Sequence, residues 1–131
     1  MEPAARARAR AVVQPVLFVL SSPRSGSSLL QLCLEASPFL CAPQELYLLQ
    51  ADSLDQRIRI IGRASGVDGG LIVAVGSLRQ SDGGTLVATW ERTSTNTCQV
   101  YEALIEWSAP KLFCDKTPGY ASDGRILARA E

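Results

Sequence analysis

The chain has 131 residues, a length that fits one globular domain or part of a larger one. Hydrophobic residues make up 47% and charged residues 20%, which is the composition of a protein with a packed core and not of a disordered chain. The 13 acidic and 13 basic residues balance, so nothing supports nucleic-acid binding, which needs a basic surface. No stretch approaches the roughly 20 apolar residues of a membrane-spanning helix, so no membrane span is expected.

Residues 1–14 are predicted to form a flexible arm. Arg6, Arg8 and Arg10 alternate with alanine there, as at the start of a transit peptide. The serines and the length of a transit peptide are missing, and so is the apolar run of a secretory signal. We therefore expect an untargeted arm before a single folded unit at 15–131, and a cytoplasmic protein.

The four cysteines are expected to be free, buried thiols in a reducing compartment. None forms a CxxC pair, and the chain has no histidine, so no zinc site is expected. The missing histidine also excludes a Ser–His or Cys–His catalytic pair within this chain.

The first predicted element is a strand at 16–20, a continuous apolar run that would be buried on both faces as a central strand of a parallel sheet. A turn rich in serine and glycine leads into the leucine-rich stretch 27–36, which predicts a mostly buried helix ended by Ser37-Pro38. A strand, a tight turn and a helix are the opening of a βαβ unit.

The remaining elements are less clear in the glycine-rich middle of the chain, where a run such as 71–75 suits a strand or a helix equally. Several N-cap residues at 93–97 precede an amphipathic stretch that Pro110 ends. In chain order we expect a short strand at 39–41, an interrupted helix at 46–61, short helices at 85–92 and 98–108, a strand at 111–114, a turn at 115–120 and the start of a helix at 124–131.

The turn after the first strand suits an anion. A loop that leaves a buried strand and enters a helix aims backbone N–H groups and the positive end of the helix dipole at one point. Here it contains Arg24, Ser25, Gly26, Ser27 and Ser28, which add a guanidinium fork, hydroxyl donors and a glycine that allows close approach. The alternative is that the serines only cap the helix and Arg24 is solvated.

This turn is not the loop of a nucleotide hydrolase. That motif reads G-x-x-x-x-G-K-[ST], whereas Ser21 stands here in place of its first glycine and Ser27 in place of its lysine.

Two segments carry a family resemblance. Residues 16–45, with the loop Pro-Arg-Ser-Gly-Ser-Ser, resemble the 5′-phosphosulfate-binding segment of sulfotransferases, and 113–120 resembles their [DE]-K-[ST]-P-x-Y segment. The arginine after the proline is similar to that of tyrosylprotein sulfotransferases and of sulfotransferase domains in bacterial polyketide assembly lines. The resemblance implies an α/β fold of the P-loop nucleoside-triphosphate-hydrolase type, with a parallel sheet and flanking helices.

The resemblance also implies roles for single residues. Residues 24–28 would bind the donor 3′-phosphoadenosine 5′-phosphosulfate (PAPS), Glu45 would be the catalytic base, and Lys116 would stabilise the transition state. All three segments follow predicted strands, so they would meet at one edge of the sheet. The alternatives are an exposed glutamate at a helix start and a solvated turn lysine. Asp115 is given no catalytic role and is expected either to partner a helix end or to orient Lys116.

The predicted function is transfer of a sulfuryl group from PAPS to a hydroxyl-bearing acceptor, without a metal. One alternative is a kinase-like P-loop enzyme, against which the missing Walker lysine counts. The other is a truncated, non-catalytic fragment or interaction module. Because only residues 121–131 follow the second segment, we expect an incomplete, inactive chain whose 3′-phosphate site lies elsewhere. The acceptor and the oligomeric state stay open.

Overall fold

A three-stranded parallel sheet lies at the centre of the chain. The computed structural model describes residues 15–22, 25–62 and 69–130, so the predicted arm at 1–14 lies outside the described residues. The strands are β1 (Leu17–Phe18), β2 (Leu40–Cys41) and β3 (Leu112–Asp115), in the order β1-β3-β2. The predicted α/β fold with a parallel sheet is confirmed.

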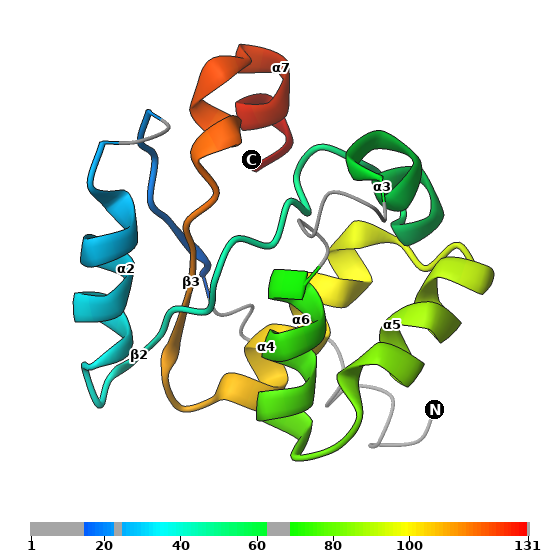
Figure 1. Ribbon diagram of the computed structural model, residues 1–131, viewed down its shortest axis with the longest axis horizontal. Coiled ribbons are helices and arrows are strands. Elements are labelled where there is room, and N and C mark those ends of the chain that lie inside the picture. Colours follow the sequence, from blue (N-terminus) through cyan, green and yellow to red (C-terminus); the bar gives the residue numbers. More distant parts are fainter. Residues whose placement is uncertain (1–14, 23–24, 63–68, 131) are drawn as a thin grey trace, which may run out of the picture.

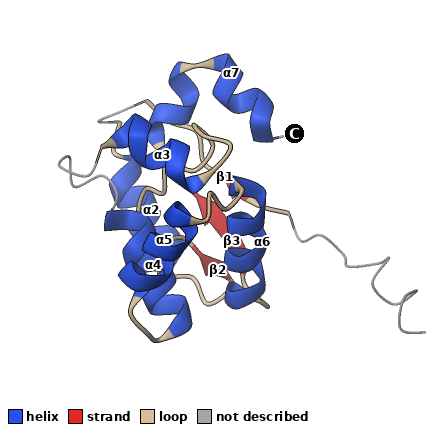
Figure 2. Ribbon diagram, turned by 90° about the vertical axis from the view of Figure 1, so that its right-hand side faces the viewer, coloured by secondary structure: helices blue, strands red, loops and turns tan. Residues whose placement is uncertain are grey.

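Helices lie on both sides of this sheet (Figures 1 and 2). In Figure 1, α2 (Ser27–Glu35) lies to the left of the strands, and the helices of the middle of the chain lie to their right. The latter are α3 (Leu54–Ile61), α4 (Gly69–Arg79), α5 (Gly83–Arg92) and α6 (Thr97–Ser108). The chain continues from β3 into η3 (Pro118–Ser122), α7 (Gly124–Leu127) and η4 (Ala128–Ala130).

The hydrophobic core fills the space between the sheet and helices α4–α6. Its fully buried side chains include Leu46, Leu48, Leu54, Leu71, Val75, Val100, Leu104 and Phe113. Helix α6 is fixed at its start by a capping box between Asn96 and Gln99, in which the Gln99 side chain accepts from the Asn96 N–H at 3.3 Å. The Asn96 side chain also accepts from the Cys98 N–H at 2.7 Å. The run 71–75, for which the sequence left a strand and a helix open, lies within helix α4.

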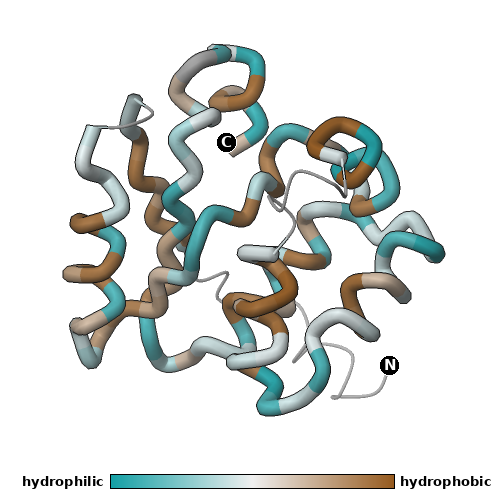
Figure 3. The backbone as a smooth tube through the Cα atoms, viewed as in Figure 1, coloured by the Kyte–Doolittle hydropathy of each residue, from teal (hydrophilic) through white to brown (hydrophobic). Residues whose placement is uncertain are grey.

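Two predictions about burial were wrong. Among the strands that the structure describes, the first lies at the edge of the sheet, because β3 occupies the centre, and Leu17 and Leu20 are 41% and 51% exposed. Helix α2 is not mostly buried: Leu29 and Leu32 are 69% and 62% exposed, and Figure 3 shows apolar segments along this outer helix. Its buried positions are polar, because Gln31 turns inward and donates a hydrogen bond to the Ala42 carbonyl.

The predicted interrupted helix at 46–61 is confirmed only in its second half, and the predicted burial of all four cysteines was wrong. Only Leu54–Ile61 is helical, because N–H groups at 46–49 donate to side chains of the segment after β3 and not to carbonyls of their own turn. Cys41 and Cys114 are buried, whereas Cys33 and Cys98 are exposed. No helix in the described part of the chain is long and apolar enough to cross a membrane.

Candidate functional site

Glu45 and Lys116 face each other at the carboxyl-terminal edge of the sheet. Lys116 directly follows β3, and its ammonium group lies 3.1 Å from Glu45 Oε1. The lysine side chain is only 3% exposed, while that of Glu45 is 34% exposed. A buried ammonium paired with a carboxylate at the edge of open space can bind a further anion or exchange partners during a reaction.

The glycine-containing turn opens onto the same space. Gly26 is the N-cap of α2 and has a φ of 83°, a left-handed conformation that glycine adopts without strain. Ser27 is buried, Ser25 and Ser28 are exposed, and no side chain caps the helix at Gly26. Arg24 lies outside the described residues.

A continuous cleft joins the turn to the Glu45–Lys116 pair. One part of about 380 Å³ is lined by Ser28, Gln31, Leu32, Gln44, Glu45, Tyr47, Gly70 and Lys116. A second part of about 390 Å³ is lined by Gly26, Ser27, Ser28, Glu45, Tyr47, Pro118 and Gly119. Ser28, Glu45 and Tyr47 belong to both parts, so an anion held by the turn would lie beside the pair.

A buried carboxylate fixes the segment after β3. Asp115 is fully buried and accepts hydrogen bonds from the hydroxyls of Tyr101, Thr117 and Tyr120, at 2.6, 2.9 and 2.9 Å. Burial raises the pKa of Asp115, against the opposing effect of these three hydrogen bonds and of the charge on Arg57. The three hydroxyls and the charge on Arg57 thus partly offset the cost of burying this carboxylate.

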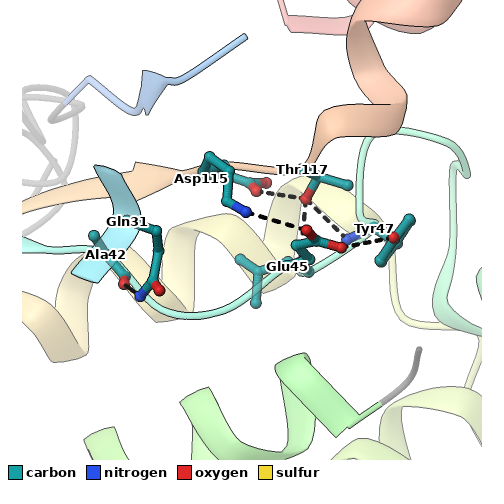
Figure 4. A network of polar contacts seen from close by, with 8 residues as sticks. Gln31, Ala42, Glu45, Tyr47, Asp115 and Thr117 are labelled. Carbon is teal, nitrogen blue, oxygen red and sulfur yellow. Dashed lines mark hydrogen bonds and ion pairs between the residues drawn. The ribbon is translucent and has the colours of Figure 1, made fainter. Parts of the chain in front are cut away.

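The same network holds the segment that carries Glu45 (Figure 4). Thr117 Oγ1 accepts from the N–H groups of Leu46 and Tyr47 at 3.2 and 3.3 Å, and the Tyr120 hydroxyl accepts from the Leu48 N–H at 2.8 Å. The buried Arg57 donates from Nε and Nη2 to the Leu46 carbonyl, at 2.9 and 2.7 Å. The irregular segment after β2 is thus fastened to the segment after β3.

The comparisons with known proteins agree with this geometry. No family model and no curated protein matches the chain. Two solved structures match with a TM-score of 0.84: the sulfotransferase domain from the Synechococcus PCC 7002 olefin synthase, at 35% identity over 88% of this chain, and the sulfotransferase domain from the curacin biosynthetic pathway, at 34% identity over 90%. In fold and in sequence, the chain is similar to part of a sulfotransferase domain. It spans 42% of the length of each of these two structures.

The fold brings most of the predicted site residues together at one cleft. Gly26, Ser27 and Ser28 line it together with Glu45 and Lys116, whereas Ser25 is exposed and does not line it. The two alternative interpretations of the pair do not hold, because Glu45 precedes no helix directly and Lys116 is buried. Within the described residues, no group of three His, Cys, Asp or Glu side chains could hold a metal ion.

Sequence reasoning missed four residues of this site. Tyr47 and Gln31 line the cleft, and Gly70 brings the start of α4 against the Glu45 backbone, where a Cβ atom would lie 2.0 Å from the Glu45 carbonyl oxygen. Arg57 is fully buried beneath the same segment. Of these four residues, only Tyr47 could have been predicted, because it lies two positions after Glu45 in the sequence.

Proposed function

We propose that the chain is part of an enzyme that transfers a sulfuryl group from PAPS to an acceptor hydroxyl. The observation that carries the proposal is the Lys116–Glu45 pair, 3.1 Å apart, in a cleft that Gly26, Ser27 and Ser28 of the turn also line. The turn and Arg24 would hold the phosphosulfate through backbone N–H groups, hydroxyls and a guanidinium. Since the chain spans 42% of its structural neighbours, the activity of the whole protein is part of the proposal.

Each residue of the pair has one task in this reaction. Glu45 takes the proton of the acceptor hydroxyl as its oxygen forms a bond to sulfur. The bond between sulfur and the bridging oxygen breaks, and the electron pair stays on the phosphate side of the donor. Lys116 stabilises the negative charge that grows on this bridging oxygen, and adenosine 3′,5′-bisphosphate leaves.

The kinase-like alternative lacks support from the site. The turn has Ser27 in place of a Walker lysine, and both structural neighbours are sulfotransferase domains. The proposed acceptor is a hydroxyl-bearing molecule. The proposed compartment is the cytoplasm, on the basis of four unpaired cysteines.

Donor binding tests the assignment of the turn. We expect the chain to bind adenosine 3′,5′-bisphosphate more tightly than ATP in calorimetry, and Arg24→Ala to weaken that binding by about 10- to 150-fold, the loss of one charged hydrogen bond. Arg59→Ala is the matched control, because Arg59 is 74% exposed and its ion pair among the described residues is with Asp55 of the same helix. Tighter binding of ATP that requires magnesium would contradict the proposal and favour the kinase-like alternative.

Turnover tests the assignment of the pair. In any form of the protein that transfers sulfuryl groups, Glu45→Gln and Lys116→Ala should each lower kcat by about 10²- to 10⁴-fold. Donor affinity should change much less, because neither side chain belongs to the turn. A Glu45→Gln variant with near-normal kcat would place the base on another residue.

A further inference from the structure

Tyr47 is a side chain of the cleft that contacts Glu45 directly and to which the proposed reaction gives no task. It lines both parts of the cleft, and its hydroxyl donates a hydrogen bond to Glu45 Oε2 at 2.7 Å. We infer that Tyr47 is a positioning residue, which holds Glu45 by Oε2 and leaves Oε1 as the oxygen that receives the acceptor's proton. This inference deepens the proposed function and rests on it.

The backbone of Tyr47 supports a role beyond packing. Its φ is 53°, in the left-handed region, which bulky residues adopt rarely and at an energetic cost. Such conformations persist only where the surrounding structure enforces them, and they cluster at functional sites. A glycine or asparagine would fit this backbone more easily than a tyrosine, so folding alone does not account for the residue.

The neighbours of Tyr47 enforce this conformation from both sides. Leu46 and Leu48 are both fully buried, and their N–H groups donate to Thr117 and Tyr120. The Tyr47 N–H also donates to Thr117, at 3.3 Å. With its flanking residues anchored in the core, the chain turns Tyr47 outward into the cleft, where its hydroxyl reaches the carboxylate two residues earlier (Figure 4).

The two oxygens of Glu45 therefore have different partners. Oε2 accepts from Tyr47, and Oε1 accepts from Lys116 at 3.1 Å. Burial, together with the hydrogen bond to Glu45 and its charge, raises the pKa of Tyr47 to about 12, so the phenol stays protonated and keeps donating at neutral pH. When Lys116 turns to the bridging oxygen of the donor, Oε1 becomes free while Tyr47 still fixes Oε2. The acceptor's proton then moves to Oε1 as the new oxygen–sulfur bond forms and the old one breaks.

The contact can be tested without turnover. The chain has three tyrosines, so labelling with 3-fluorotyrosine gives three fluorine resonances, and Tyr47→Phe identifies the resonance of Tyr47. The fluorinated phenol ionises at lower pH than tyrosine, which brings the titration closer to neutral pH. We expect Glu45→Gln to shift the titration of Tyr47 to lower pH, because it removes the neighbouring negative charge. Glu102→Gln, which alters an exposed carboxylate on α6, should leave it unchanged.

The role of the contact is tested by kinetics. Tyr47→Phe keeps the ring and the backbone but removes the hydroxyl, so kcat should fall by about tenfold while the KM for the donor stays unchanged. A normal kcat for Tyr47→Phe, or a Tyr47 titration that Glu45→Gln does not alter, would overturn the inference even if the donor binds. If the titration shifts as expected but adenosine 3′,5′-bisphosphate does not bind, the proposed function fails and the positional contact stands.

Discussion

Asp115 shows at the scale of one residue how the site stores a charge in the core. Three hydroxyls satisfy its carboxylate, and the positive charge of Arg57 lowers the cost of holding it there. Burial outweighs these effects and raises the pKa of Asp115 above its value in an unfolded chain. Burying the carboxylate of Asp115 therefore lowers the stability of the folded chain. The same carboxylate positions Thr117 and Tyr120, whose hydroxyls bind the segment that carries Glu45.

Because burial raises the pKa of Asp115, the contribution of this residue to the free energy of unfolding depends on pH. Between the unfolded pKa of about 4 and the raised folded pKa, the folded chain binds more protons at Asp115 than the unfolded chain. The free energy of unfolding of the natural chain, minus that of Asp115→Asn, should therefore fall as pH rises through this window. Urea unfolding followed by circular dichroism at a series of pH values measures the difference.

Asp82→Asn is the matched control for that measurement. Asp82 caps α5, and hydrogen bonds from the Thr85 hydroxyl and from backbone N–H groups lower its pKa. Its contribution to stability is present above the unfolded pKa and is lost as pH falls through the lowered folded pKa. The two differences should thus slope in opposite directions, and parallel slopes would show that Asp115 is not held in a desolvating site.

The sequence allowed the candidate site residues to be predicted where each followed a short apolar strand. Glu45 and Lys116 come after β2 and β3, and parallel strands end at one edge, so their encounter follows from topology. The places of Tyr47 and Arg57 in the site could not be predicted from the sequence. Their roles depend on a backbone turned left-handed at one position and on a carbonyl aimed into the core, which no periodicity encodes.

At the scale of elements, the start of α4 sets the position of Glu45. Gly70 packs so closely that a Cβ atom there would lie 2.0 Å from the Glu45 carbonyl oxygen, a distance that no atom pair tolerates. Gly70→Ala should push α4 and the Glu45 segment apart and destabilise the chain by about 1–3 kcal/mol. Thermal unfolding measures this loss.

Gly69→Ala provides the control on the same helix. A Cβ atom at Gly69 would meet nothing within 4 Å, so alanine there should be neutral or stabilise the helix by up to about 1 kcal/mol. Equal effects of the two substitutions would mean that the close approach of Gly70 to Glu45 does not exist in solution.

The elements themselves were predictable where local signals were strong. The N-cap residues before α6 and the proline after it bounded that helix within one residue of its start, because capping chemistry acts locally. The same reasoning failed for the segment 46–53, which is not helical. Its leucines resemble a helix, but its N–H groups find partners on Thr117 and Tyr120, some 70 residues later in the chain. Tertiary hydrogen bonds of this kind override local preference.

At the scale of the whole molecule, one side of the sheet is covered far less well than the other. Helices α4–α6 bury a continuous core, whereas α2 presents Leu29 and Leu32 to the outside, 69% and 62% exposed. These two leucines are three residues apart on one helix and so share a face. Among the described residues, β1 at the sheet edge on this side pairs with β3 alone. An exposed apolar face beside an open sheet edge favours association with another surface.

The 131-residue chain should therefore self-associate through the face of α2. Burying one exposed leucine contributes about 1.5–3 kcal/mol, so Leu29→Gln and Leu32→Gln should each weaken association by about tenfold or more in sedimentation equilibrium. Ile60→Gln is the matched control, because Ile60 is 54% exposed but lies on α3, away from this face. Neither substitution changes a core residue, so the unfolding temperatures of both variants should stay close to that of the natural chain. Leu32 also lines the cleft, so Leu29→Gln is the variant that leaves the cleft unchanged. A natural chain that is monomeric at all concentrations, or a control that dissociates the assembly as strongly, would show that the leucines of α2 do not drive association.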